Sequence, residues 1–153
     1  MADRVSASIV IGGKVTPAQF AQLCPLIADN DLRMDWDGEP FASDQIPQGE
    51  PLRLCAHETP WGMFDSLEQY CCDQRIPYLR WSGSCPGSFG AERMVYDGKS
   101  EPLNFAVDED DHLVLHAQTI AQLGSIRAIR RYFAEAEIQL PPFEIAGGVP
   151  LPD

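Results

Sequence analysis

The sequence predicts a single α+β domain over residues 1–145, followed by a flexible C-terminal tail at residues 146–153. A length of 153 residues fits one domain, and the order strand, Thr-Pro, helix, strand occurs twice along the chain. Thr59-Pro60 opens the second predicted helix as Thr16-Pro17 opens the first. Two tandem βαβ units of this kind predict a ferredoxin-like arrangement, extended here by a β-hairpin and a C-terminal helix.

The first predicted strand lies within residues 6–14, where Ile9, Val10 and Ile11 are apolar at consecutive positions. Such a run indicates a strand that is covered on both faces. The helix that follows has a clear start. Thr16 can cap it, Pro17 suits the first helical position, and Gln19 completes a capping box.

The remainder of the first unit is less regular. Pro25 should kink the helix or restart it, because proline lacks the backbone N–H that an inner helical turn needs. Leu32, Met34 and Trp36 alternate with charged residues, and this alternation predicts a half-buried strand. Residues 38–50 contain two prolines and two glycines and predict a loop.

The second unit repeats this plan, with a strand at Leu52–His57, a helix from Thr59-Pro60 and a strand from Pro77 to Trp81. A loop of small residues, Ser82–Gly90, follows. The strands Glu92–Tyr96 and Leu103–Val107 are then joined through Asp97-Gly98, a strong signal for a hairpin turn.

The C-terminal part begins with an acidic turn at Asp108–Asp111 and a short predicted strand at His112–His116. A helical turn closes at Gly124, and Ser125 caps a final helix. We expect that helix to face inward through Ile126, Ile129, Phe133 and Ala136, and outward through Arg127, Arg130 and Arg131. Residues 140–145 should be extended and able to pair with a sheet edge.

The charge balance limits the classes of partner. The chain has 23 acidic against 11 basic residues, a net charge of -12, and such a surface repels phosphate groups. Direct binding of nucleic acid or of an anionic membrane is therefore disfavoured, and a basic protein surface is favoured, including one that normally holds nucleic acid. The ordinary alternative is that the charge serves solubility alone.

The five cysteines show no disulfide spacing, and no apolar run reaches the length of a membrane span. Together with the absence of a signal-peptide pattern at the N-terminus, these features predict reduced thiols and a cytoplasmic protein.

None of the catalytic and metal-binding patterns that the sequence suggests is complete. Asp108, Asp110, His112 and His116 have donors suited to a divalent metal, but their spacing matches no known ligand signature, and a solvated hairpin with two surface histidines explains them better. His57-Glu58 lacks the second histidine of a metalloprotease helix. We expect no metal and no cofactor.

A cysteine nucleophile has equally little support. Cys71-Cys72 lies late in a helix, where the helix dipole does not lower a thiol pKa, although His57 could approach it in the fold. Cys85 lies in the Ser82–Gly90 loop, which lacks the Gly-Lys-Ser/Thr of a phosphate-binding loop. The sequence therefore favours a non-catalytic protein.

The carboxylates are dense from Asp29 to Glu50 and again at Asp108–Asp111, and Trp61 stands at a junction where it could be an exposed anchor. The predicted partner-binding residues are Asp35, Asp37, Glu39, Asp44, Glu58, Trp61, Asp108, Glu109, Asp110 and Asp111.

Three functions remain open. The first is an acidic interaction module that binds and inhibits or modulates a basic protein, as a nucleic-acid mimic or an inhibitor of a defence system would. The second is a ligand-binding or catalytic domain with a site between the sheet and the Ser82–Gly90 loop, using His57, Cys85 or Glu92. The third is a structural subunit of a larger assembly, in which the edge strand and the C-terminal segment pair with a partner. The sequence leaves the oligomeric state open.

Overall fold

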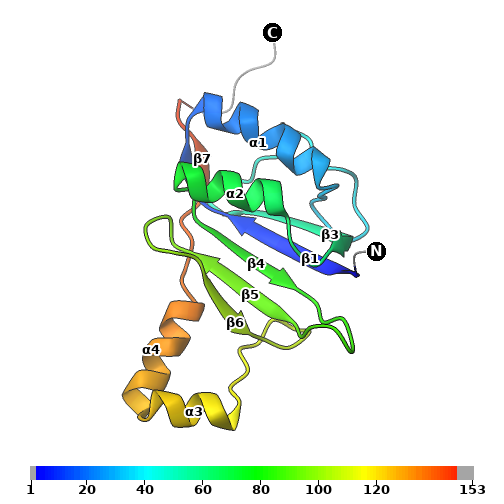
Figure 1. Cartoon of the computed structure of the whole chain (residues 1–153). Coiled ribbons are helices and arrows are strands. Elements are labelled where there is room, and N and C mark those ends of the chain that lie inside the picture. The colour runs from blue at the N-terminus through cyan, green and yellow to red at the C-terminus, as the bar shows by residue number, and fades with distance from the viewer. Residues whose placement is uncertain (1–2, 148–153) are drawn as a thin grey trace.

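The protein is a mixed α+β structure built on a five-stranded antiparallel sheet (Figure 1). A computed structural model describes residues 3–147. The elements along the chain are β1 Arg4–Ile11, β2 Gly13–Val15, α1 Pro17–Asp29, β3 Leu52–Pro60, α2 Asp65–Gln74, β4 Tyr78–Ser82, β5 Glu92–Tyr96, β6 Leu103–Ala106, α3 Ala117–Leu123, α4 Ile126–Ala136 and β7 Phe143–Ile145.

Strand β1 is second in the sheet order β3-β1-β4-β5-β6 and pairs antiparallel with β3 on one side and β4 on the other. Its side chains alternate, with Ala7, Ile9 and Ile11 fully buried and the residues between them partly buried. The buried set packs with the apolar faces of α1 and α2, which lie across one face of the sheet (Figure 1). The predicted strand is confirmed, and its second face is more open than the apolar run suggested.

One of the two predicted βαβ units is present. Because β3 and β4 each run antiparallel to β1, they are parallel to one another, so β3-α2-β4 is a split βαβ unit with β1 between its strands. The first unit is not formed, and the prediction of a tandem ferredoxin-like pair was wrong on this point. Residues 32–36 contribute only isolated bridges from Arg33 to Pro40 and to Cys55.

The reason is local. Leu32 donates its backbone N–H to Ile27 at the end of α1, and Gly38 donates to Asp35, so the chain turns on both sides of Arg33. Arg33 alone exchanges two backbone hydrogen bonds of 2.9 Å with Cys55 on the edge of β3. The alternating residues 32–36 therefore form two turns joined by a one-residue bridge, and the strand predicted there is not present.

The two helix starts differ from one another. At α1 the capping box is confirmed, since the Thr16 hydroxyl accepts from the Gln19 N–H at 3.1 Å and the Gln19 side chain accepts from the Thr16 N–H at 2.9 Å. The helix also continues through Pro25 to Asp29 without restarting.

The prediction that Thr59-Pro60 opens α2 was wrong. Strand β3 extends to Pro60, the chain turns at Trp61 and Gly62 with φ of 58° and 68°, and α2 begins at Asp65. The Thr59 hydroxyl is buried without a hydrogen-bond partner, whereas Glu68 accepts the Phe64 N–H at 2.7 Å at the helix start. The capping role that the sequence assigned to a threonine is carried out by a glutamate side chain one turn inside the helix.

The β5-β6 hairpin is confirmed, but no strand forms at His112–His116, where only Leu113 bridges to Val107. After it, α3 ends at Gly124, which has a positive φ of 77°, and the Ser125 hydroxyl caps α4 by accepting from the Ala128 N–H at 3.1 Å. The two helices form a hairpin that projects from the body of the molecule (Figure 1).

The expected inward face of α4 was wrong at Ile126, which is 66% exposed, whereas Ile129 and Phe133 are half-buried and Ala136 is buried. The three arginines predicted to face outward are exposed. The helix contacts the sheet through its C-terminal half, where Ala136 and Tyr132 pack with Val95 and Phe105. The extended segment after the helix forms β7, which pairs in parallel with β2 in a separate two-stranded sheet. Residues 148–153 of the predicted tail lie outside the described residues.

A buried ion-pair network joins α2 to the sheet. Arg80 on β4 is 1% exposed, and its Nε and Nη1 atoms each lie 3.0 Å from a carboxylate oxygen, on Glu68 and Glu92 respectively. Nη1 also donates to the Ser82 hydroxyl at 3.1 Å, and Glu92 accepts from Asn104 at 2.6 Å. A buried guanidinium needs such partners, since an unpaired charge is strongly unfavourable in the interior.

Replacing Arg80 by Met should lower the free energy of unfolding by about 3–5 kcal/mol, because it leaves the Glu68 carboxylate buried without its cation. Urea unfolding followed by circular dichroism measures the change. Arg53→Met on the exposed side of β3 is the control and should change stability by less than about 0.5 kcal/mol. In Arg80→Met/Glu68→Gln the glutamine keeps the acceptor for Phe64 and should recover most of the loss; an Arg80→Met variant as stable as wild type would contradict the role of the network.

Candidate interaction surface

The face of the sheet opposite α1 and α2 carries the candidate site. Strand register places Cys55, Ser8 and Trp81 side by side on neighbouring strands, while the adjacent residues in each strand point toward the helices. Ser8 and Trp81 are only partly buried, and the segment that follows α1 lies over this region, with Trp36 among the residues that line a hollow against β1 and β3.

Three aromatic rings form the centre of this face. The ring centroid of Trp36 lies 5.2 Å from that of His57 and 6.4 Å from that of Trp81, the latter in an edge-to-face arrangement. The indole N–H of Trp81 donates to the backbone carbonyl of Asp108 at 3.2 Å. The aromatic group therefore links the acidic segment after α1 to the acidic turn after β6, two regions far apart in the sequence.

We call this region the acid–aromatic surface. Its members are Asp35, Trp36, Asp37, His57, Glu58, Trp81 and Asp108, together with Asp110, which lies beside Asp108. Trp36 is 40% exposed although it packs against two other rings, so an apolar side chain is offered to solvent at the centre of the carboxylates. This combination is typical of protein–protein contacts, in which a partly exposed aromatic residue serves as the anchor.

A groove of about 540 Å³ lies beside Trp36 and is lined by carboxylates as well as cations. The two arginines of this groove already form hydrogen bonds within the molecule. Arg33 donates to the Gly38 carbonyl at 2.8 Å, and Arg4 donates to the Glu58 carbonyl at 3.3 Å. The Asp37 carboxylate is fully exposed, with His57 Nε2 3.7 Å away, so it remains open to an incoming cation.

In the acidic turn at Asp108–Asp111, some carboxylates form intramolecular hydrogen bonds and others remain exposed to solvent. Asp111 pairs with the nearly buried Arg93 at 2.9 Å and accepts that arginine's Nε–H. Asp108 accepts the backbone N–H groups of His112 and Asp110, at 2.8 and 2.9 Å, and the bond from His112 is the main cause that lowers its pKa. Asp110 has no side-chain hydrogen bond within the described residues, and its carboxylate is exposed.

Glu109 holds the Ser82–Gly90 loop in place through hydrogen bonds to Ser84. Its carboxylate accepts from both the hydroxyl and the backbone N–H of Ser84, the latter at 2.9 Å, and these two bonds hold the pKa of Glu109 below its ordinary value. Within the loop, Cys85 and Phe89 exchange backbone hydrogen bonds of 2.8 and 3.0 Å. The loop of small residues is thus a turn held in place by hydrogen bonds.

The structure brings together half of the predicted partner-binding residues, namely Asp35, Asp37, Glu58, Asp108 and Asp110. Glu109 and Asp111 are used internally, as described above. Glu39 and Asp44 are exposed in the loop before β3, without a contact that joins them to the aromatic group. Trp61 is 46% exposed as predicted, but it packs against Phe89 at 6.4 Å and belongs to a different cluster.

The proposed catalytic groups are not assembled. Glu92 shares a face of the sheet with Ser82, Ala7 and Ala56, whereas His57 follows Ala56 and contacts Trp36 on the opposite face. All five thiols have a pKa raised mainly by burial or desolvation, and that of Cys55 is raised further by the Asp35 carboxylate. Each is therefore held in its neutral, less nucleophilic form.

One group of side chains has the donors of a metal site. The ligand atoms of Asp108, Asp110 and His112 lie within 4.8 Å of one another, and all three residues are exposed. His116, the fourth residue of the sequence pattern, is not part of the group. The Asp108 oxygen that accepts two backbone N–H groups already has a structural role, and this arrangement is that of a hydrogen-bonded turn.

Sequence reasoning missed the central role of Trp36, which was assigned to a core strand. The signal that could have placed it is Asp35-Trp36-Asp37-Gly38, in which charged residues flank the indole and a turn pair follows at once. The contact between Trp36 and Trp81 had no such signal, since it depends on how the segment after α1 crosses the sheet.

A comparison of the chain with protein-family models, with curated proteins and with solved structures finds no match. None of the helices within residues 3–147 combines the length and the apolar character needed to cross a membrane.

The Trp36–Trp81 pair should be visible in solution. Two indoles at this separation couple in the far-ultraviolet circular dichroism spectrum and give an exciton couplet. We expect Trp36→Phe and Trp81→Phe each to remove the couplet, while Trp61→Phe leaves it intact because Trp61 packs with Phe89. A couplet that survives in Trp36→Phe would show that the segment after α1 does not lie against β4.

The Glu109–Ser84 contact predicts a pH dependence. Since the folded-state pKa of Glu109 is lowered, its stabilising effect is complete above the ordinary glutamate value of about 4.3 and is lost as the pH falls through the lowered pKa. The amide resonance of Ser84 in NMR spectra should titrate with that lowered pKa. In Glu109→Gln the titration should disappear; a wild-type midpoint at or above the ordinary value would argue against the contact.

Proposed function

We propose that this protein is a non-catalytic interaction module that binds a basic protein surface through its acid–aromatic surface and thereby inhibits or modulates that partner. The observation that carries the proposal is the contact of Trp36 with Trp81, whose indole N–H reaches Asp108, because it joins two separate acidic segments around an exposed aromatic side chain. Such a surface offers both long-range attraction and a central apolar contact.

The electrostatics support a cationic partner. A net charge of -12 accelerates association with a basic surface and repels nucleic acid and anionic membranes. Asp35 and Asp110 have no salt-bridge partner within the described residues, and Asp37 has only His57 at 3.7 Å. They can therefore pair with incoming lysine or arginine side chains without first breaking an internal bond.

A partner whose basic surface normally holds nucleic acid fits this chemistry, since carboxylates can occupy the positions of phosphates. This would make the protein a nucleic-acid mimic, for example an inhibitor of a defence system. All five cysteines are free thiols, which supports a reducing compartment such as the cytoplasm as its place of action.

The two other functions have weaker support. A catalytic or ligand site that used His57 and Glu92 together would need groups that lie on opposite faces of the sheet. A structural subunit that donates its C-terminal segment to a partner would have to release β7, which is already paired with β2 and fastened by the Ala146 N–H to Val15 at 2.7 Å.

Charge reversal tests the proposal. With a nona-arginine peptide as the probe, Asp35→Lys/Asp37→Lys/Asp110→Lys should weaken binding by at least about 100-fold, since each lost charge pair is worth about 1 kcal/mol or more. Isothermal titration calorimetry measures the affinity, and increasing salt should weaken the wild-type interaction.

The matched control places the same three reversals elsewhere, in Asp73→Lys/Glu101→Lys/Glu144→Lys, on the end of α2, the β5-β6 turn and β7. This variant has the same net charge and should retain most of the affinity. Equal losses in the two variants would mean that net charge alone attracts the peptide, and the acid–aromatic surface would then have no specific role.

A further inference from the structure

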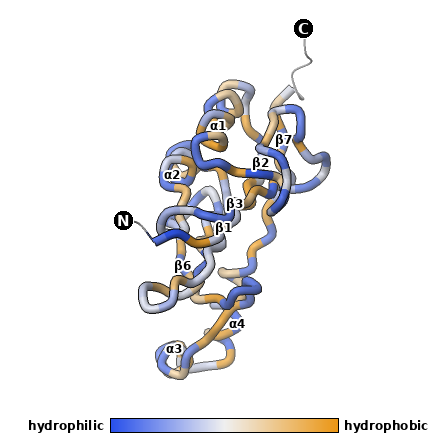
Figure 2. Tube along the Cα trace, turned by 90° about the vertical axis from the view of Figure 1, so that its right-hand side faces the viewer, coloured by the Kyte–Doolittle hydropathy of each residue, from blue (hydrophilic) through white to orange (hydrophobic). Residues whose placement is uncertain are grey.

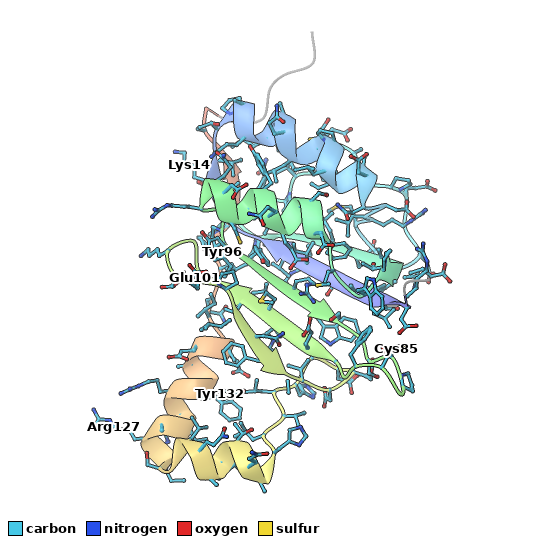
Figure 3. The ribbon with its side chains drawn as sticks, viewed as in Figure 1. Lys14, Cys85, Tyr96, Glu101, Arg127 and Tyr132 are labelled. Atoms are coloured by element: carbon cyan, nitrogen blue, oxygen red, sulfur yellow. The ribbon has the colours of Figure 1, made fainter. Side chains whose placement is uncertain are left out.

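The α3-α4 hairpin is chemically unlike the rest of the molecule. It carries Arg127, Arg130 and Arg131 against a single acidic residue, Glu135, in a chain that is otherwise strongly acidic. Among residues 3–147, none of these arginines lies within salt-bridge distance of a carboxylate. In Figure 3, Arg127 points outward from α4, away from the body of the protein.

The hairpin also exposes apolar side chains. Ile126 and Ile120 are 66% and 45% exposed, and the sheet packs only against the C-terminal half of α4, through Tyr132 and Ala136. Figure 2 shows the hairpin at the opposite end of the molecule from α1, with hydrophobic and hydrophilic residues mixed along it. A projecting basic element with exposed isoleucines has the properties of a docking element.

The same chain contains a surface of complementary chemistry. The acid–aromatic surface has free carboxylates around Trp36, whereas the hairpin has free arginines around Ile126. In Figure 1 the segment after α1 and the β4-β5 connection lie at the right of the molecule, and the hairpin tip lies at the lower left. The hairpin tip is therefore distant from this part of the acid–aromatic surface within one molecule, whereas the two can meet between two molecules.

We propose that the α3-α4 hairpin of one molecule docks on the acid–aromatic surface of a second copy. This proposal rests on the proposed function of that surface, and it adds a regulation: self-association covers the surface that binds the basic partner. The opposite charges set the orientation, and the isoleucines and Trp36 supply apolar contact. Two hairpins packing on each other would instead bring six arginines together, which like-charge repulsion disfavours.

A contact between two different surfaces either closes into a symmetric pair or ring or continues into a chain of molecules. Sedimentation velocity of the wild-type protein should show species heavier than the 16.9 kDa monomer at about 0.1 M salt, and they should be lost at about 1 M salt, where screening is nearly complete.

Two variants identify the surfaces. The hairpin variant is Arg127→Glu/Arg130→Glu/Arg131→Glu, and the surface variant is Asp35→Lys/Asp37→Lys/Asp110→Lys. Each should be monomeric alone, while an equimolar mixture should form a 1:1 heterodimer. The control Asp73→Lys/Glu101→Lys/Glu144→Lys should still self-associate, and circular dichroism checks that every variant is folded.

The outcomes separate this inference from the proposed function. A wild-type protein that binds nona-arginine through the acid–aromatic surface but stays monomeric at low salt overturns the self-association alone. Self-association that survives in the hairpin variant, or a mixture of the two variants that remains monomeric, overturns it as well. If nona-arginine does not bind while the mixed heterodimer forms, the docking stands and the wider function fails.

Discussion

The structure depends on the position of β1 between β3 and β4 in the sheet, antiparallel to both. Because side chains alternate along a strand, this pairing sends Ala7, Ile9 and Ile11 to the helices and leaves Ser8 on the other face. A shift of one residue in the register would exchange the two faces. The apolar core and the acid–aromatic surface are therefore fixed by one and the same set of backbone hydrogen bonds.

The acidic character of the protein has two distinct uses. Some carboxylates have structural roles, as Glu68 does beside the buried Arg80 and Asp111 beside Arg93. Others, such as Asp35 and Asp110, are exposed and free of side-chain partners in the described part of the chain. Only the second group is available to pair with cations of a partner. The net charge therefore overstates the number of carboxylates that can bind, and the positions of the free carboxylates matter more than the total.

The hairpin of α3 and α4 adds the opposite charge at a separate place. It contacts the sheet through the C-terminal half of α4, where Tyr132 packs against Phe105 and the Arg93 guanidinium donates to the Ala136 carbonyl at 2.8 Å, while α3 projects away from the sheet (Figure 1). Under the proposed self-association, a second copy and the basic partner would bind the same acid–aromatic surface. Competition between these two contacts would make the activity of the protein dependent on concentration and on ionic strength.

The sequence by itself determined the features that arise from near neighbours: the α+β class, the capping box at Thr16, the β5-β6 hairpin and the acidic character. These depend on local hydrogen bonding and composition. Only the tertiary structure decided that residues 32–36 cross the sheet as a turn and that Thr59-Pro60 ends a strand. In both cases pairing with β1 or β3 outweighed local preference, since backbone groups at a sheet edge require partners.

The same distinction holds for the site. The sequence showed which residues are acidic and that Trp61 could be exposed, whereas the edge-to-face contact of Trp36 with Trp81 joins segments that no periodicity relates. That contact exists because the turn at Asp35–Gly38 places Trp36 over the open face beside β1. Trp36 therefore became the centre of the candidate site through tertiary packing, a long-range effect that local sequence patterns do not contain.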